Sequence, residues 1–428
     1  MAMQEGNPVF DISRDLLHFI TKAPTPFHAA QAMKTAFVYD GAIELREEDE
    51  WEITPGHKYV VTRNGSALVA FAVPESGAED FRILAAHGDS PTFRIKENPE
   101  LSDSYYVRLN VEGYGGMLMH TWTDRPLGVA GRVMVREGNH VVPHLVATGK
   151  PILLIPSLAI HMDPKANAGH AWNVAKDLIP LYGLAGGTIS FMDVIAAEAR
   201  CRKEDILGYD LSLVSLVPGT IWGAEDEFVS APRLDDLQCA FAGFRGFTMG
   251  QKEKHIAVFA LFDNEEVGSR TRQGAGSAFL SDTLLRIAEA LGKTRGQLSA
   301  MLAKSFFISA DNAHAVHPNH PEEADAVHRP VLNGGIVLKF NAEQKYCTDG
   351  YSAAHFRLLC EEAGVPLQVY TNRSDKAGGS TLGNIAMTHI APPAVDIGLP
   401  QLSMHSSYET AGIRDTAYLV TVAAKFFE

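Results

Sequence analysis

The feature that most constrains the fold is an alternation of apolar strands and helices that begins near residue 231. Helical patterns cover 234–247, 281–291 and 352–363, and strand patterns cover 255–262, 304–309, 335–340, 366–370 and 394–397. The first 93 residues fit the same design, with helical patterns around 12–20 and 26–35 and strand patterns at 58–63, 67–73 and 81–86. Such alternation predicts an α/β fold with a mostly parallel central sheet and helices on both faces.

Residues 94–230 have a different texture. Alternating strand patterns at 105–111 and 131–135 are separated by frequent Gly and Pro turn signals, and one helix is predicted near 193–202. We therefore expect a discontinuous domain made of 1–93 and 231–428, interrupted by an inserted β-rich domain at 94–230.

The composition excludes several classes of protein. The chain has 428 residues, with 37 basic and 51 acidic side chains, and its net charge of −14 disfavours nucleic acids and anionic membranes as partners. No apolar run approaches the roughly 18 residues of a membrane helix, and no signal-peptide pattern is visible. The four cysteines form no CxxC pair, which argues against thiolate zinc ribbons and redox dithiols. A disulfide framework is not expected in a chain of this length without a secretion signal. A cytoplasmic location is expected.

Polar side chains with metal-binding chemistry follow several predicted strands. His87 and Asp89 follow the third strand, the Glu265–Glu266 pair follows 255–262, Asp311 follows 304–309, and His405 comes after 394–397. Because open α/β sheets bind ligands outside the carboxyl ends of their strands, these residues are expected to converge. Imidazole nitrogen together with carboxylate oxygen suits zinc, and also manganese or cobalt.

Each of these motifs also has an ordinary structural explanation. A Glu-Glu pair is usually a solvated helix start, and Asp235 could simply cap the helix at 234–247. Asp311 could lie in a turn, and His405 could be a hydrogen-bonded core histidine. Only the coincidence of several such residues, most of them at strand ends, favours a catalytic site.

Five motifs together resemble the M18 family of aspartyl aminopeptidases, in order and spacing, over almost the whole chain. They are HGDSP at 87–91, SAPRLDD at 230–236, DNEEVGS at 263–269, SADNAHAVHPNH at 309–320 and LPQLSMHS at 399–406. The resemblance implies a dinuclear-metal aminopeptidase that releases N-terminal Asp or Glu from peptides. It implies two divalent ions per chain, with zinc expected and manganese or cobalt as alternatives.

The resemblance also implies the metal ligands. His87 and His405 would each be a terminal ligand of one ion, and Asp235 would bridge the two. Glu266 and Asp311 would complete the two coordination spheres, leaving positions open for water and substrate.

Two acidic residues then remain without a metal to bind. Glu265 is the candidate general base, which would take a proton from water and pass it to the leaving amine. Asp89 lies two residues past His87, on the same face of an extended segment, and would accept the second imidazole N–H of His87 or of another ligand.

Recognition of an acidic side chain requires a local cation in a net-acidic protein. Lys339 matches the family position for this role, although a solvated lysine at a strand end is the ordinary explanation, and Lys376 offers a second cation. Tyr346 is a candidate donor to the tetrahedral oxyanion. His317 could reach the site of a neighbouring subunit.

His161 lies in the apolar stretch 157–161, where a core histidine is the default. The family pattern has a histidine here too. We expect His161 to bind substrate or the transition state across a subunit contact, and keep metal ligation as an alternative.

The family resemblance further implies dimers that assemble into a tetrahedral dodecamer, with the inserted domain as the dimerisation domain. Three other functions stay open: the same chemistry with another N-terminal preference, a catalytically silent assembly or binding protein, and a metal-dependent hydrolase of another bond. The presence of all five ligand candidates and of Glu265 argues against the silent protein.

Overall fold

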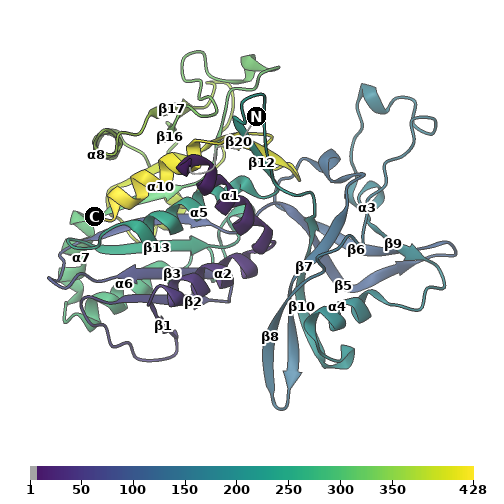
Figure 1. Cartoon of the computed structure of the whole chain (residues 1–428), viewed down its shortest axis with the longest axis horizontal. Coiled ribbons are helices and arrows are strands. Elements are labelled where there is room, and N and C mark those ends of the chain that lie inside the picture. Colours follow the sequence, from purple (N-terminus) through teal and green to yellow (C-terminus); the bar gives the residue numbers. More distant parts are fainter. Residues whose placement is uncertain (1–6) are drawn as a thin grey trace. The chain divides into compact units, whose positions relative to one another are not determined.

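The structure is a computed structural model that describes residues 7–428, and these divide into two compact units (Figure 1). Unit 1 contains the residues up to Asp89, Gly219–Met404 and Glu409–Glu428, and unit 2 contains Ser90–Pro218 and His405–Tyr408. The chain therefore passes between the units at 89/90, 218/219, 404/405 and 408/409, whereas the sequence patterns placed the boundaries at 93/94 and 230/231.

Unit 1 is built on a nine-stranded sheet in the order β1-β2-β3-β13-β4-β14-β18-β16-β17. Strands β13, β4, β14 and β18 run parallel to one another, whereas β3 and β16 pair antiparallel with this central group. The strands are β1 (Ile43–Leu45), β2 (Lys58–Arg63), β3 (Ala67–Ala72), β4 (Phe81–His87), β13 (Ile256–Phe262), β14 (Phe306–Ala310), β16 (Ile336–Phe340), β17 (Leu367–Thr371) and β18 (Ala394–Gly398).

Helices cover both faces of this sheet because its central strands are apolar on both sides. In β13, Phe259 and Leu261 pack into one hydrophobic cluster while Val258 and Phe262 pack into another, as the period of two in a strand requires. The first cluster includes α1 (Pro8–Lys22), α2 (Pro26–Tyr39), α5 (Leu234–Met249), α8 (Gly350–Glu362) and α10 (Asp415–Phe426). The second includes α6 (Phe279–Ala290), α7 (Arg295–Lys304) and α9 (Leu382–Ala386). The predicted α/β fold class is confirmed.

A smaller five-stranded sheet also belongs to unit 1. Its order is β11-β12-β20-β19-β15, formed by β11 (Thr220–Trp222), β12 (Phe228–Ala231), β15 (Ala313–His314), β19 (Pro400–Leu402) and β20 (Glu409–Gly412). The pairing of β12 with β20 explains why residues 219–230 belong to unit 1 and not to the β-rich insert.

Unit 2 contains an antiparallel sheet in the order β8-β7-β10-β5-β6-β9. Its strands are β5 (Thr92–Ser102), β6 (Tyr106–Tyr114), β7 (Leu127–Glu137), β8 (His140–Ala147), β9 (Leu181–Leu184) and β10 (Ile206–Ser215), accompanied by α3 (Val174–Asp177) and α4 (Phe191–Ala199). Phe93, Leu127 and Phe191 lie in its own hydrophobic core. The β-rich character predicted for this segment is confirmed.

Two further observations complete the fold. Helix α7 was missed by the sequence patterns because few of its side chains are apolar and buried, Leu298 and Met301 being the ones that are. Along residues 7–428, none of the helices combines the length and the apolar character needed to cross a bilayer.

Candidate active site

Three neighbouring strands bring their chemical residues to one edge of the central sheet. β4 lies between β13 and β14 and is parallel to both, so the carboxyl ends of the three strands are adjacent. β4 ends at His87, β13 is followed by a short 3₁₀ turn that begins at Glu265, and β14 is followed directly by Asp311. The register of a parallel sheet therefore brings these residues together.

Asp235 joins this edge from the beginning of α5. Its backbone N–H donates to Oε2 of the buried Glu409, at 3.0 Å. The following residue, Asp236, is fully buried and accepts a hydrogen bond from the backbone N–H of His87 at 3.1 Å. These two contacts fix the start of α5 against β4 and β20.

His87 is the centre of the resulting cluster. Its Nε2 lies 3.7 Å from Oδ1 of Asp235 and 3.7 Å from Oδ1 of Asp311. Two groups of candidate ligand atoms in unit 1, each within 4.8 Å of one another, contain this histidine: His87 with Asp235 and Asp311, and His87 with Glu265 and Glu266. The structure thus brings together five of the residues singled out in the sequence.

Asp89 connects the two sides of the cluster. The Nδ1 atom of His87 lies 3.1 Å from the carbonyl oxygen of Asp89 and 3.4 Å from its Oδ1. The same carboxylate accepts hydrogen bonds from the backbone N–H groups of Glu265, at 3.1 Å, and Glu266, at 3.2 Å. Asp89 therefore orients the imidazole and also positions the turn that carries both glutamates.

Without a bound cation, the ionised forms of the buried carboxylates around His87 are energetically unfavourable. Burial raises the pKa of Glu265 to about 8, and the nearby carboxylates of Asp311 and Asp89 add to this effect. Burial also raises the pKa of Glu266 well above its ordinary value. At His87 burial disfavours the charged form, but the carboxylates of Asp311 and Asp89 outweigh it and raise the pKa of the imidazole. So many buried carboxylates around one imidazole require compensating positive charge.

The donor set fits a metal that binds nitrogen and oxygen. One imidazole nitrogen faces several carboxylate oxygens, and the other nitrogen of His87 is held by Asp89, which fixes the tautomer in the way usual for metal-binding histidines. Zinc accepts these ligands, and the charge of a divalent ion would offset the buried carboxylates.

His405 belongs to the segment 405–408, which packs with unit 2. Its Nδ1 lies 2.6 Å from the carbonyl oxygen of Gly116 in that unit. The segment is joined to unit 1 by the chain at both ends, through Met404 and Glu409. Whether His405 serves as a ligand of the cluster in unit 1 stays a prediction.

Lys339 is a buried residue of β16, 3% exposed, and not a solvated lysine. Its Nζ donates to the carbonyl oxygen of Asn312 at 2.8 Å and lies 3.7 Å from Oδ2 of Asp311. Burial alone would lower the pKa of Lys339, but Asp311 and other neighbours raise it above its ordinary value, so the side chain carries a positive charge.

Tyr346 lies beside Lys339, whose Nζ is 5.5 Å from the centre of the tyrosine ring. Burial raises the pKa of this tyrosine to about 12, so its hydroxyl keeps its proton. Lys376 is half exposed and pairs with Glu323 at 3.0 Å. The two lysines singled out in the sequence therefore lie in different environments: Lys339 is buried beside Asp311, and Lys376 forms an ion pair at the surface.

The remaining two histidines lie in exposed loops. His317 accepts a hydrogen bond from the backbone N–H of Asn319 at 3.2 Å. His161 is exposed and its neighbours Ile160 and Met162 are 48% and 74% exposed, so it is not a core histidine, and its expected contact with substrate stays a prediction. None of the groups of metal-binding side chains found within residues 7–428 includes His161.

Sequence reasoning missed the polar residues beneath the cluster. Glu409 holds the backbone of Asp235, and the amide of Asn312 donates to Gln238 at 2.8 Å and to the carbonyl oxygen of Leu399 at 3.2 Å. Gln238 in turn donates to Thr416 at 2.9 Å. Buried polar residues directly after a recognised motif, as Asn312 follows Asp311, are the signal that could have revealed them.

Comparison with protein families identifies one that spans the chain. A family model described as Aminopeptidase I zinc metalloprotease (M18) matches residues 19–427. A probable M18 family aminopeptidase 2 from Clostridium novyi (strain NT) is 45% identical over 424 residues, which cover 97% of this chain and 98% of that protein.

Solved structures show the same similarity in three dimensions. A chain in the cryo-EM structure of the Ape4 and Nbr1 complex superposes with a TM-score of 0.96 at 35% identity and covers 100% of this chain and 87% of that one. The S. cerevisiae mApe1 dodecamer gives a TM-score of 0.86 at 28% identity and covers 97% of this chain and 96% of that one.

Proposed function

Because the chain belongs to the M18 family of zinc metalloproteases and is a metalloaminopeptidase, we propose that it releases N-terminal aspartate and glutamate from peptides with a pair of divalent ions. The observation that carries this proposal is the convergence of His87, Asp235, Glu266 and Asp311 around one point, with the acidic Glu265 beside them. Imidazole and carboxylate ligands of this kind hold catalytic zinc in other metallopeptidases.

Five residues are proposed to hold the two ions. Asp235 would be shared between them, Glu266 and Asp311 would each bind one, and His87 and His405 would be the terminal ligands. Zinc is the proposed metal, with manganese and cobalt as alternatives that accept the same donors. When bound, the ions would supply Lewis acidity toward the scissile carbonyl and lower the pKa of the attacking water.

Glu265 is the proposed general base. Its carboxylate takes a proton from the attacking water and returns it to the leaving amine. Without a bound cation, burial raises the pKa of Glu265 to about 8, and divalent ions bound beside it would lower the pKa again, leaving an ionised carboxylate that can act as a base. The hydrogen bond from the backbone of Glu265 to Asp89 keeps the side chain beside the cluster while the proton moves.

Lys339 is the proposed recognition group for the acidic side chain of the substrate. Its buried positive charge lies 3.7 Å from Asp311, a proposed metal ligand, and in a low-dielectric setting it attracts a carboxylate strongly. Tyr346 is the proposed donor to the oxyanion, and Lys376 is the second candidate for the recognition group.

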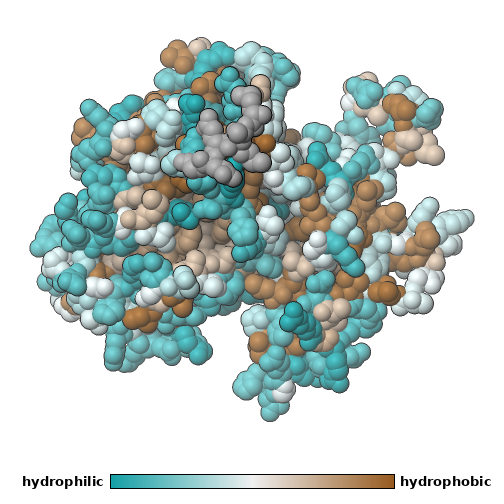
Figure 2. All heavy atoms as spheres, viewed as in Figure 1, coloured by the Kyte–Doolittle hydropathy of each residue, from teal (hydrophilic) through white to brown (hydrophobic). Residues whose placement is uncertain are grey.

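We also propose that the chain assembles into dimers and then into a tetrahedral dodecamer, with unit 2 as the dimerisation domain. The similar mApe1 forms a dodecamer. Hydrophobic side chains gather over unit 2 on the face drawn in Figure 2, and exposed apolar residues of this unit include Tyr105, Leu158, Met162, Leu184 and Ile189. His161 and His317 are proposed to reach the site of a neighbouring subunit.

A cytoplasmic location completes the proposal. All four cysteines, Cys201, Cys239, Cys347 and Cys360, are free thiols, as is usual in a reducing compartment.

One experiment tests the main proposal. The purified protein is analysed for metal content and assayed against a panel of aminoacyl chromogenic substrates, with and without a chelator. Two ions per chain, loss of activity with chelator, and the highest kcat/KM on aspartyl and glutamyl substrates are expected. Equal or greater kcat/KM on neutral residues would contradict the acidic specificity, and one ion at full activity would contradict the dinuclear site.

A further inference from the structure

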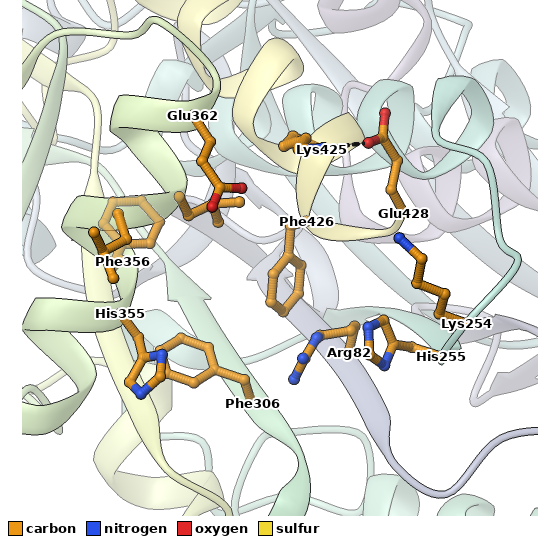
Figure 3. A pocket seen from close by; sticks show the side chains of 12 residues that line it. Arg82, Lys254, His255, Phe306, His355, Phe356, Glu362, Lys425, Phe426 and Glu428 are labelled. Carbon is orange, nitrogen blue, oxygen red and sulfur yellow. Dashed lines mark hydrogen bonds and ion pairs between the residues drawn. The ribbon is translucent and has the colours of Figure 1, made fainter.

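A cavity lies in unit 1 at the end of the sheet opposite the candidate active site. Its volume is about 320 Å³, and it lies where β4, β13 and β14 begin and where α8 and α10 end (Figure 3). Arg82 is the second residue of β4, His255 immediately precedes β13, and Phe306 is the first residue of β14. The same three strands carry His87, Glu265 and Asp311 at or just past their other ends.

This position separates the cavity from the catalytic chemistry. A strand rises about 3.3 Å per residue, so the five steps along the chain from Arg82 to His87 span roughly 16 Å. A ligand in the cavity would therefore not touch the metal-binding cluster.

One side of the cavity carries positive charge. Arg82 and His255 share the buried carboxylate of Asp80, at 3.5 Å from the guanidinium and 2.7 Å from the imidazole. Lys254 adds an exposed ammonium that forms no ion pair with any residue between 7 and 428. Arg82 and Lys254 each carry a permanent positive charge, whereas Asp80 supplies one negative charge, so this side has an excess of positive charge.

The other side carries negative charge. Glu362, near the end of α8, forms no ion pair within the described part of the chain, and Glu428 is paired with Lys425 at 2.7 Å. The Glu428–Lys425 pair adds no net charge, and Figure 3 shows Glu428 on the same side as Lys254, so Glu362 supplies the negative charge of the opposite side. Figure 3 shows Glu362 and Lys254 on opposite sides of the cavity, with the ring of Phe426 between them.

Aromatic rings form the surface between the two charged sides. Phe306 and Phe426 are both largely buried and contact each other edge to face, with ring centres 6.2 Å apart. The imidazole of His355 lies on the other side of Phe306, with 6.0 Å between ring centres. Such a surface favours a flat or apolar side chain.

From this arrangement we propose that the cavity binds a free amino acid with an apolar or aromatic side chain. Lys254 and Arg82 would hold its carboxylate, Glu362 would hold its ammonium, and Phe306 and Phe426 would contact its side chain. The volume is at the low end of the range of about 300–1,000 Å³ found for ligand pockets, which suits a molecule of this size. A ligand with only one charge would leave one side of the cavity without a partner.

Calorimetric titration of the metal-loaded protein tests this proposal, with L-phenylalanine as the probe. Two analogues each lack one charge: 3-phenylpropionate has no ammonium, and 2-phenylethylamine has no carboxylate. Saturable binding of L-phenylalanine is expected, with each analogue at least about threefold weaker, the scale of one exposed ion pair. Absence of saturable binding, or equal binding of either analogue, would overturn the proposal.

Variants locate the binding site. Lys254→Met and Glu362→Gln should each weaken the binding of L-phenylalanine about threefold or more, and the double variant about tenfold, while peptidase activity stays unchanged. Glu361→Gln and Lys22→Met alter exposed residues that do not line the cavity and should bind like the parent protein. Unchanged binding by the double variant would show that the amino acid occupies another place on the protein, such as the active site.

Discussion

The ammonium of Lys339 lies 3.7 Å from the carboxylate of Asp311, inside the protein and at the carboxyl edge of the central sheet. The same ammonium donates to the carbonyl oxygen of Asn312, the next residue along the chain. Lys339 therefore has two possible effects on catalysis: it would attract an acidic substrate, and it holds the loop that carries a candidate metal ligand. A test of specificity must separate these effects.

The first prediction concerns the variant Lys339→Met, which keeps most of the apolar stem and removes the charge. An unpaired, desolvated substrate carboxylate costs on the order of 2–5 kcal/mol, so kcat/KM for aspartyl and glutamyl substrates should fall about 10²-fold or more. Damage to the loop at Asp311 would lower kcat/KM for every substrate by a similar factor. The ratio of kcat/KM for aspartyl and alanyl substrates is therefore the quantity to measure, and it should drop.

Lys376→Met is the matched control, because Lys376 is an exposed lysine already paired with Glu323. It should leave the ratio of aspartyl to alanyl cleavage unchanged. If Lys376→Met lowers the ratio and Lys339→Met does not, the recognition group is Lys376. If neither does, a group from a neighbouring subunit, such as His317, selects the substrate.

The second prediction concerns the base. Glu265→Gln keeps the size of the side chain and the backbone hydrogen bond to Asp89, but an amide cannot take a proton. We expect kcat to fall by at least ~10²-fold, the usual scale of general-base catalysis, with full metal content. Near-normal turnover at full metal occupancy, measured by elemental analysis on the assayed sample, would show that another group accepts the proton.

The third prediction concerns the bridge. Asp235→Ala removes the proposed shared carboxylate and leaves two cations facing each other with less negative charge between them. At least one metal equivalent per chain should be lost, together with activity. The backbone hydrogen bond from residue 235 to Glu409 is kept in this variant, so the circular dichroism spectrum should match that of the parent. Two ions retained per chain would leave Asp235 as a helix-start residue without a ligand role.

The positions of the catalytic candidates could be predicted from the sequence because a parallel sheet leaves little choice. Once β4, β13 and β14 are parallel neighbours, the residues that follow their last apolar positions must lie at one edge, as His87 and Asp311 do. The two-residue spacing of His87 and Asp89 likewise predicts that their side chains share one face, and the carboxylate lies 3.4 Å from Nδ1 of the imidazole.

Long-range contacts could not be predicted in this way. The sequence gives no indication that Lys339 points to Asn312 or that Glu409 supports Asp235, because these pairs depend on how β16 and β20 pack against other strands. The same limit applies to His161, since an apolar run is read as core even when the fold leaves it on the surface. Helix α7 was missed because it buries too few apolar side chains to show a periodic pattern.

The last prediction concerns stability and pH at a site remote from catalysis. Asp415 begins α10, is fully buried, and accepts hydrogen bonds from the backbone N–H groups of Asn333 at 2.7 Å and Gly335 at 3.1 Å. Burial raises the pKa of Asp415 to about 7, even though these hydrogen bonds favour the ionised form. The native state therefore holds a proton that the unfolded chain releases above its ordinary pKa of 3.8.

The sign of the effect follows from this difference. The contribution of the protonated Asp415 is fully present below about pH 4 and is lost as the pH rises through about 7, which amounts to roughly 4 kcal/mol. Asp415→Asn cannot titrate, so its free energy of unfolding, relative to the parent, should increase between pH 5 and pH 8. Urea unfolding across this range measures the difference, and Asp282→Asn, an exposed carboxyl on α6, should follow the parent curve. A constant difference between Asp415→Asn and the parent at all pH values would mean that Asp415 is ionised throughout and acts only as a hydrogen-bond acceptor for the loop at Asn333.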